Sequence, residues 1–272
     1  MPKVPRARTT QRKGPLQGTR KAALAAVTDG ASSSSEEEEH ASNYLFHCAL
    51  VDTEDPMITR MLSVPSTFTL DQMHVVLQIA FGWSNCHMWQ FEMHNIFSSE
   101  EEEHAEYERN GNKPLTTFMT DPEDMRSWAN DGDKYNSRYQ ETSEWKLLDI
   151  FEGDGYRGNV NLIYEYDMGD GWEHEITFLG VEDPGLRKAL MDGAEFNTPL
   201  CFSGEGHPCA EDCGGTPGWE HLKAVFTKPR ARDPGDLKTW YKSSCHNGDK
   251  KGLDPYKWSI LDVNDRLTEM KA

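Results

Sequence analysis

The fold of this chain is decided by the stretch Tyr164-Glu-Tyr-Asp-Met-Gly-Asp-Gly-Trp-Glu-His174, which joins two strongly patterned segments through a glycine-containing turn. On each side of the turn, apolar and polar residues alternate with a period of two, as in a strand with one buried face. The apolar positions are Val160, Leu162, Tyr164 and Tyr166 before the turn, and Trp172, His174, Ile176 and Phe178 after it. The stretch therefore predicts an antiparallel hairpin.

The register of this hairpin follows from side-chain chemistry. A two-residue turn would set Asp167 opposite Trp172, which mixes an acid into the apolar face. A three-residue turn at 168–170 instead pairs Tyr166 with Trp172 and Tyr164 with His174. Burial favours the second register. We therefore expect His174 to point inward and Asp170 to lie at the turn beside it.

The flanking sequence predicts further strands and helices around this hairpin. Strands are expected at 44–51, 57–64 and 87–93, and the last of these places His87 on the same face as Trp89 and Phe91. A capping box at Thr69 to Gln72 opens a helix that ends at Gly82. Three more helices are expected at 216–226, 233–243 and 259–270. The pattern indicates an α+β fold, a single domain at 44–270 in which helices pack on an antiparallel sheet.

Two segments differ in composition from this domain. Residues 1–43 are basic and then rich in Ser and Glu, a composition that cannot bury enough apolar surface to fold, so we expect a disordered tail. Residues 97–143 carry an acidic run at 100–103 among Asn, Gly, Asp and Pro. We expect this segment to be a flexible acidic insertion, looped out of the domain.

Charge and composition restrict the partners of the folded body. The chain of 272 residues has a formal net charge of −18, and residues 1–30 hold seven Lys or Arg against one Asp, so the remainder carries about −24. We therefore expect no nucleic acid to bind the folded body. No stretch is long and apolar enough for a bilayer, and the six cysteines are too few and too irregular for a disulfide framework. An intracellular protein is predicted, in the cytoplasm or nucleus.

An ordered series of motifs resembles a known family, the one named after the third open reading frame of a root-inducing plasmid, whose members are often found in bacterial mobile elements. The matching motifs are Asp55-Pro-Met-Ile-Thr-Arg60, Thr69-Leu-Asp-Gln-Met-His74, Ala80-Phe-Gly-Trp83 with His87, the 164–174 stretch, Pro199-Leu-Cys201, Glu211-Asp-Cys-Gly-Gly215, Trp219-Glu-His-Leu222 and Asn264-Asp-Arg-Leu267. The chain departs from the family at Met168, where Phe is usual, at Ala210, where a second Pro is usual, and in its long insertion.

The resemblance implies an α+β domain whose biochemical role is largely unassigned. Some members carry a resolvase-like label from their transposon context. Serine recombinases need a nucleophilic serine amid arginines and a helical DNA-binding module, and this acidic body shows neither.

Four side chains from three predicted elements are candidate metal ligands. His87 and His174 lie on inward strand faces, Asp170 lies at the turn, and Cys213 precedes a helix. Imidazole, carboxylate and thiolate are the ordinary ligands of zinc, so zinc or another divalent metal is the predicted cofactor. The alternative is that each histidine is a core residue whose ring is hydrogen-bonded. A second possible ligand set is Cys201, His207, Cys209 and Cys213, although its spacing is not that of a standard zinc site.

The same region predicts a polar pocket lined by Asp167, Asp170, Trp172, Glu211 and Asp212. The glycines at 214 and 215 could expose backbone donors to an anion, but the adjacent acids favour a turn in which Asp212 caps backbone donors. The predicted function is a non-enzymatic binding or interaction module that takes an unknown protein or small ligand. The alternative is a metal-dependent hydrolase with Glu173 or Asp212 as base.

Overall fold

The predicted hairpin is the centre of the structure, a computed structural model that describes residues 42–111, 113–122, 138–156, 159–190, 198–228, 232–233 and 235–270. Its strands are β6 (Val160–Tyr166) and β7 (Trp172–Val181). Tyr166 pairs with Trp172, Tyr164 with His174 and Leu162 with Ile176, which confirms the predicted register. All of the pairs just named are buried, so the period of two identified the inner face correctly.

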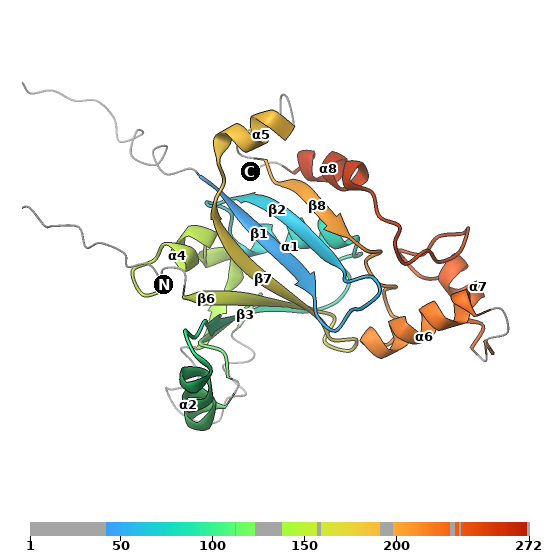
Figure 1. The fold of residues 1–272 in the computed structure, drawn as a ribbon, viewed down its shortest axis with the longest axis horizontal. Helices are drawn as coiled ribbons and strands as arrows, with labels where there is room; N and C mark the ends of the chain where they lie inside the picture. The colour runs from blue at the N-terminus through green and yellow to red at the C-terminus, as the bar shows by residue number, and fades with distance from the viewer. Residues whose placement is uncertain are drawn as a thin grey trace, which may run out of the picture. The chain divides into compact units, whose positions relative to one another are not determined.

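The hairpin lies inside a sheet of eight strands with the order β5-β4-β3-β6-β7-β1-β2-β8 (Figure 1). The other strands are β1 (Asn43–Leu50), β2 (Thr59–Pro65), β3 (Trp89–Asn95), β4 (Thr116–Met119), β5 (Tyr139–Glu141) and β8 (Leu200–Glu205). Every neighbouring pair is antiparallel except β4 with β5. The described residues belong to one compact unit, and this arrangement confirms the predicted α+β class. Residues 1–41 of the predicted tail lie outside the described residues.

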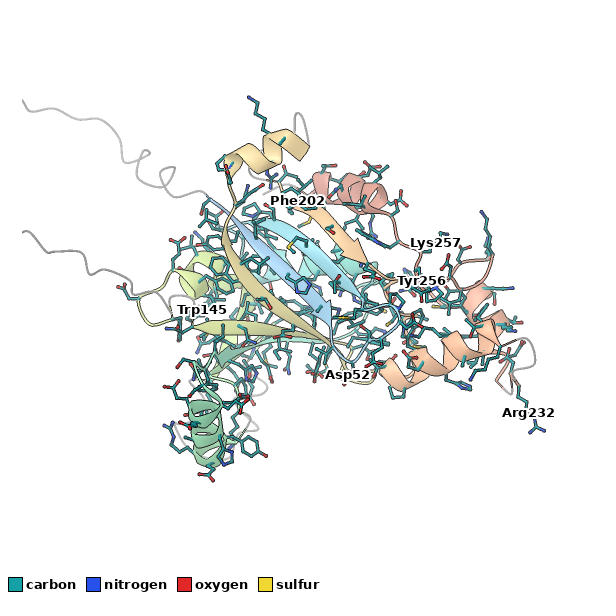
Figure 2. The ribbon with its side chains drawn as sticks, viewed as in Figure 1. Asp52, Trp145, Phe202, Arg232, Tyr256 and Lys257 are labelled. Atoms are coloured by element: carbon teal, nitrogen blue, oxygen red, sulfur yellow. The ribbon has the colours of Figure 1, made fainter. Side chains whose placement is uncertain are left out.

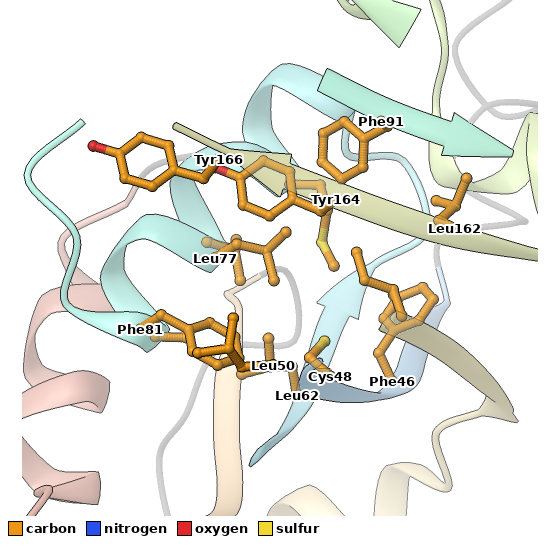
Figure 3. Packing of buried hydrophobic residues seen from close by; sticks show 14 of the residues in the cluster. Phe46, Cys48, Leu50, Leu62, Leu77, Phe81, Phe91, Leu162, Tyr164 and Tyr166 are labelled. Atoms are coloured by element: carbon orange, nitrogen blue, oxygen red, sulfur yellow. The ribbon is translucent and has the colours of Figure 1, made fainter. Parts of the chain in front are cut away.

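Helix α1 (Leu70–Phe81) covers the inner face of this sheet. Thr69 and Gln72 form the predicted capping box, and Gly82 ends the helix in the left-handed conformation with φ 68°. The apolar side of α1 meets alternate residues of β1, β2, β3 and β6 in a continuous core. Figure 3 shows this packing, with Leu77 and Phe81 of the helix facing Cys48, Leu62 and Tyr164 of the strands. The core fixes the position of the loop that follows α1.

The segment at 97–143 differs from the predicted looped-out insertion. Residues 112 and 123–137 are outside the described part, but the rest contains helix α2 (Glu100–Asn110) and strands β4 and β5, which extend the sheet beyond β3. Phe118 of β4 pairs with Phe91 of β3, is fully buried, and packs edge-on against Trp145, which is labelled in Figure 2. Thr116, Thr117 and Phe118 of this four-residue strand are all buried, so part of the predicted insertion belongs to the sheet.

The remaining described helices are 3₁₀ helix η3 (Thr142–Glu144), α4 (Leu147–Phe151), α5 (Pro184–Leu190), α6 (Gly215–Thr227), α7 (Leu237–Ser243) and α8 (Ile260–Thr268). The three predicted C-terminal helices correspond to α6, α7 and α8. Helix α6 begins beside the β6–β7 turn, where a Cβ at Gly215 would lie 2.5 Å from the carbonyl oxygen of Asp170, so only glycine fits. None of the helices in the described part of the chain is long and apolar enough to cross a membrane.

Candidate functional site

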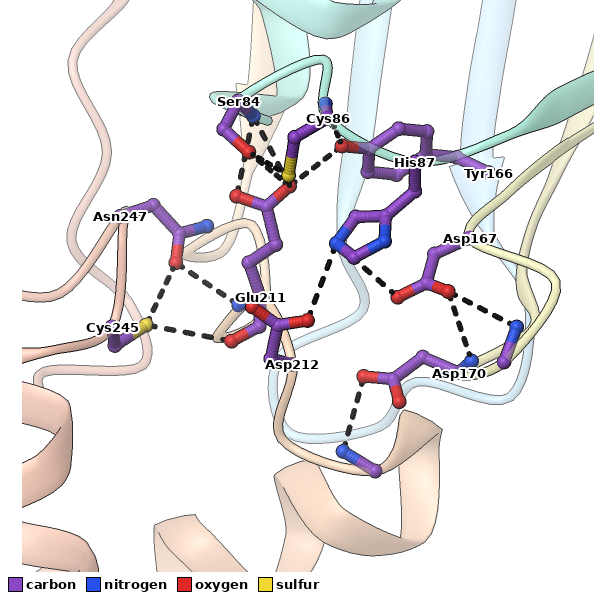
Figure 4. A network of polar contacts seen from close by, with 12 residues as sticks. Ser84, Cys86, His87, Tyr166, Asp167, Asp170, Glu211, Asp212, Cys245 and Asn247 are labelled. Carbon is purple, nitrogen blue, oxygen red and sulfur yellow. Dashed lines mark hydrogen bonds and ion pairs between the residues drawn. The ribbon is translucent and has the colours of Figure 1, made fainter.

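Three loops meet at one end of the sheet and bring the candidate site together. They are the loop after α1 at 82–88, the β6–β7 turn at 167–171, and the loop before α6 at 211–214. Figure 4 shows their polar side chains in contact with one another. We call the group formed by these loops the loop cluster.

The loop after α1 is anchored to that helix by its own polar contacts. The backbone N–H of Asn85, which has a φ of 56°, donates to the side-chain oxygen of Gln78 at 2.8 Å. The Oδ1 of Asn85 lies 2.8 Å from Nε2 of His74. The ring of His74 is stacked on Trp89 with a centroid separation of 3.9 Å. Asn85 therefore holds the loop in a conformation that carries Cys86 and His87 outward from the end of β3.

A buried carboxylate, Glu211, ties the same loop to the hairpin. Its Oε1 accepts hydrogen bonds of 2.6 Å from the hydroxyl groups of Tyr166 and Ser84, and the backbone N–H of Ser84 donates to the same carboxylate at 3.2 Å. Burial, and then the hydrogen bond to Glu211, raise the pKa of the Tyr166 phenol. The phenol is therefore a permanent donor at physiological pH. Charge-assisted bonds of this kind are short and strong, so Glu211 fixes the relative positions of two of the loops.

His87 faces two carboxylates from the other two loops. Its Nε2 lies 3.2 Å from Oδ1 of Asp212 and 3.6 Å from Oδ2 of Asp167. Neither contact has hydrogen-bond geometry, so this buried nitrogen has no hydrogen-bond partner among the described residues. The His87 side chain is 25% exposed and that of Asp212 is 60% exposed, so solvent reaches the group from one side.

Backbone conformation places both of these aspartates. Asp167 has a φ of 56° and Asp212 a φ of 62°, a region that Asn and Asp tolerate better than other non-glycine residues. The Oδ1 of Asp167 accepts the backbone N–H of Gly169 at 3.0 Å, which leaves Oδ2 directed toward His87. The two carboxylates therefore converge on the imidazole from two different turns.

Two groups of potential ligands lie within the loop cluster, and both contain His87. In each group the ligand atoms lie within 4.8 Å of one another. One group is His87, Asp167 and Asp212, and the other is Cys86, His87 and Glu211. In the second group, Glu211 is already engaged by Tyr166 and Ser84. In the first group, the side chain of Asp212 makes no hydrogen bond to another described residue. The arrangement of the first group suits a divalent cation.

His174, the second predicted ligand, lies apart from these groups in the core. It is fully buried, and its Nδ1 lies 3.0 Å from the carbonyl oxygen of Trp172 and 3.2 Å from that of Tyr164. Its Nε2 accepts a bond from the indole N–H of Trp83 at 3.4 Å. Burial lowers the pKa of His174 to about 4. Both nitrogens are thus satisfied within the protein, as in the alternative interpretation of a core histidine.

The other two predicted ligands, Asp170 and Cys213, have different partners. The Oδ2 of Asp170 accepts the backbone N–H of Gly214 at 3.0 Å, which joins the β6–β7 turn to the start of α6. The thiol of Cys213 donates weakly to the carbonyl oxygen of Gly215, and burial raises its pKa. The set of His87, Asp170, His174 and Cys213 is therefore not one of the ligand groups of the described residues. Only His87 is common to the predicted and observed groups.

The structure also separates the second predicted set of Cys201, His207, Cys209 and Cys213, which forms no such group in the described residues. The Nε2 of His207 lies 3.1 Å from the hydroxyl of Tyr241, and the thiol of Cys201 donates to the carbonyl of Ser203. Burial raises the pKa of Cys201 to about 11, so this thiol stays protonated. These side chains belong to the packing between β8 and the C-terminal helices.

The predicted pocket residues divide between the loop cluster and the core. Asp167, Glu211 and Asp212 lie in the cluster, and Asp170 joins two of its loops. Trp172 is fully buried beneath them and stacks on Trp83, with ring centroids 5.4 Å apart. Glu173, one of the two predicted bases, alternates to the outer face of β7 and is exposed there. It cannot serve a site on the inner side of the sheet.

Sequence analysis missed Ser84, Cys86 and Tyr166 as members of the site. The structure shows Cys86 exposed. Its thiol lies 2.9 Å from the hydroxyl of Ser84 and 3.9 Å from Oε1 of Glu211. The available signal was local: Ser84 and Asn85, which follow the helix-ending Gly82 after one tryptophan, mark an irregular loop and not the start of a strand.

Comparisons with known proteins find a protein of similar structure and a protein of similar sequence. A solved structure of similar fold is the protein of unknown function MM3350 from Methanosarcina mazei, with a TM-score of 0.56, 20% identity, and coverage of 82% of this chain and 98% of that one. The uncharacterised protein y4hQ of Sinorhizobium fredii is 27% identical over 202 residues, which span 72% of this chain and 80% of the relative.

The sequence profile of a family described as plasmid pRiA4b ORF-3-like protein matches residues 42–258. The matched region begins at the first strand of the sheet and includes all three loops of the loop cluster. The resemblance seen in the ordered motifs is thereby confirmed. This chain belongs to the plasmid pRiA4b ORF-3-like family.

Proposed function

We propose that the protein is a binding module that holds a divalent metal ion between His87, Asp167 and Asp212, and that it recognises its ligand through this ion. The observation that carries the proposal is the orphaned Nε2 of His87, which faces two carboxylate oxygens without making a hydrogen bond to either. A buried polar atom is normally paired, and a metal is one partner that would satisfy it.

The spacing of these atoms fits a shared ion better than direct contacts. Zinc binds imidazole nitrogen and carboxylate oxygen at about 2.0–2.2 Å, so two tetrahedral ligand atoms lie roughly 3.4 Å apart. The two distances from Nε2, 3.2 and 3.6 Å, bracket that value. The three side chains come from three loops that are joined to one another through Glu211 and through the bond from Gly214 to Asp170. The ligand group is therefore held together before any ion arrives, which favours binding.

The ligand types narrow the choice of ion. One imidazole with two carboxylates combines a ligand preferred by zinc and iron with ligands preferred by manganese and magnesium. Zinc and manganese accept both. Soft ions would turn instead to the exposed thiol of Cys86, whose group also includes His87 and Glu211. The site thus supports zinc or manganese as the resident ion.

The proposal is tested by titration calorimetry of the tag-free protein, stripped with a chelator, against zinc and manganese chloride. We expect one equivalent of at least one ion to bind to the wild-type protein. Asp167→Asn and His87→Ala should each abolish or strongly weaken this binding, because each removes one of three ligands.

Asp170→Asn is the matched control for Asp167→Asn. It makes the same change of charge three residues away, and its side-chain oxygen can still accept the bond from Gly214. We expect it to bind metal as the wild type does. Absence of binding by the wild type, or equal binding by wild type and His87→Ala, would contradict the proposal. Loss of binding only in Asp170→Asn would favour the ligand set predicted from sequence.

A second candidate function is metal-dependent hydrolysis, favoured by the exposure of Asp212 and by a ligand count of three. Three protein ligands leave a coordination position for water, as catalytic zinc sites do. With Glu173 on the outer face of the sheet, Asp212 is the remaining predicted base, and it also serves as a ligand in this group. The test is hydrolysis of p-nitrophenyl phosphate and of p-nitrophenyl acetate by the zinc- or manganese-loaded protein. Activity that is lost in His87→Ala would support an enzyme over a binding module.

A further inference from the structure

A second site lies on the opposite side of the sheet, between helix α2 and the outer faces of β3, β6 and β7. The hollow has a volume of about 660 Å³, within the range of small-ligand pockets. Its walls include Glu92, His94, Asn161, Ile163, Glu173 and the inward side of α2. Figure 1 shows α2 beside the ends of β3 and β6. We call this hollow the α2 cleft.

The α2 cleft is strongly acidic. Five glutamates line it, Glu92, Glu100, Glu103, Glu106 and Glu173, against one lysine and one arginine, Lys113 and Arg138. Within the described residues, Glu92 pairs with His94 and Glu106 with Arg109, whereas Glu103 and Glu173 have no ion-pair partner. The lining therefore presents unneutralised negative charge to whatever enters the cleft.

The sheet face beside the cleft concentrates like charges at close range. Glu165 of β6 pairs directly across the sheet with Glu173 of β7. Like charges in opposite positions of neighbouring strands are destabilising. Burial, and then repulsion by Glu173 and Glu92, raise the pKa of Glu165, although a hydrogen bond from Gln90 opposes this. A cationic ligand bound near these carboxylates would offset their mutual repulsion. The repulsion therefore favours the binding of a cation.

The cleft also offers apolar surface between its carboxylates. Phe97, Tyr107, Pro114, Leu115 and Ile163 contribute to the lining. Tyr107 and Leu115 are exposed at 62% and 36%. Lysine and arginine side chains carry an aliphatic stem that packs on apolar surface and a cationic head that pairs with carboxylates. The lining matches both parts of such a side chain.

We propose that the α2 cleft binds a lysine- or arginine-rich peptide segment of a partner protein. The inference is independent of the metal proposal, because the cleft lies on the outer face of the sheet and shares no residue with the loop cluster. Its basis is the combination of a half-open hollow, carboxylates without an ion-pair partner among the described residues, and interleaved apolar side chains on one helix and three strands.

The test uses fluorescence anisotropy of the full-length protein with a labelled eight-residue peptide of alternating lysine and leucine. A peptide with glutamate in place of lysine serves as the ligand control. The site variant is Glu103→Gln with Glu173→Gln, and the matched control is Glu101→Gln with Glu175→Gln. Both double variants remove two exposed charges from α2 and β7, but Glu101 and Glu175 do not line the cleft.

We expect the basic peptide to bind and the acidic peptide not to bind. The site variant should weaken binding by about three- to tenfold, because each exposed ion pair makes a modest contribution. The matched control should change binding by less than about twofold. Equal weakening in both double variants would show that only the overall charge attracts the peptide and would overturn the proposal, as would no binding by the wild type.

Discussion

The core under the sheet and the loop cluster at its end place a histidine in opposite environments. In the core, His174 has every ring nitrogen engaged by a carbonyl or an indole N–H and is shielded from water. In the loop cluster, His87 is partly exposed and faces two carboxylates, and its Nε2 has no hydrogen bond to any residue that the structure describes. A satisfied histidine serves packing, whereas an unsatisfied one beside acids is available for a ligand.

The first test of this contrast is His174→Ala, which should have the largest effect on stability. The substitution leaves a cavity in the core and removes the partner of the Trp83 indole and of two carbonyl groups. We expect the free energy of unfolding to fall by about 3 kcal/mol. Urea unfolding followed by tryptophan fluorescence measures it. Metal binding by the folded fraction should persist, and its loss would show that the two histidines act together after all.

The second test is Glu211→Gln, which weakens the clamp between the loop after α1 and the hairpin. An amide keeps the size of the side chain but loses the charge that strengthens the bonds from Tyr166 and Ser84, and it turns an NH₂ toward one donor. We expect a cost of about 2 kcal/mol by urea unfolding. Glu220→Gln, on the exposed side of α6, is the control and should cost less than about 0.5 kcal/mol. Equal costs would mean that Glu211 is not a clamp.

The third test uses pH and the buried histidines. Burial lowers the pKa of His74, His174 and His207 to about 4 each, while an unfolded histidine takes up its proton near pH 6.5. Between these values the unfolded chain binds more protons than the folded one, so stability falls as pH falls from 6.5 toward 4. Each ring contributes up to about 1.4 kcal/mol per pH unit to that slope.

His74→Gln removes one of these rings while keeping a side chain that can contact Tyr164 and Asn85. We expect the slope of unfolding free energy against pH, measured from pH 5 to 6.5, to decrease by about 1 kcal/mol per unit, because the unfolded histidine is only partly protonated at the upper end of this range. An unchanged slope in His74→Gln would show that the ring of His74 is already protonated in the folded protein.

The sequence predicted the core of this molecule far better than the loop cluster, and the reason is the range of the interactions. The alternation around Tyr164 and His174 and the capping box at Thr69 are local patterns, and local patterns also determined the structure there. The bond between Ser84 and Glu211 joins residues 127 positions apart, and no periodicity encodes it. Such a contact emerges only when the sheet is assembled.

The position of His87 illustrates the same limit at a single residue. The alternation of inward and outward side chains holds within β3, where Trp89 and Phe91 share one face. The strand begins at Trp89, however, so the alternation does not extend back to His87. Asn85, with a positive φ, breaks the extended backbone just before it. The side chain therefore leaves the inner face and meets Asp167 and Asp212. The two aspartates were predicted as pocket residues, since short acids in glycine-rich turns are a visible local signal.

The smallest expected effect on stability is that of His87→Ala in metal-free protein, and it gives the sharpest separation of the two regions. The ring is partly exposed and makes no hydrogen bond through Nε2, so its removal should change the free energy of unfolding by less than about 0.5 kcal/mol. An ion that binds only the folded state, at a hundred times its dissociation constant, stabilises that state by about 2.7 kcal/mol. Zinc or manganese should therefore raise the melting temperature of the wild type, raise that of His87→Gln less or not at all, and leave that of His87→Ala unchanged. A rise of equal size in wild type and His87→Ala would place the ion elsewhere, and a large loss of stability without metal would make His87 a packing residue like His174.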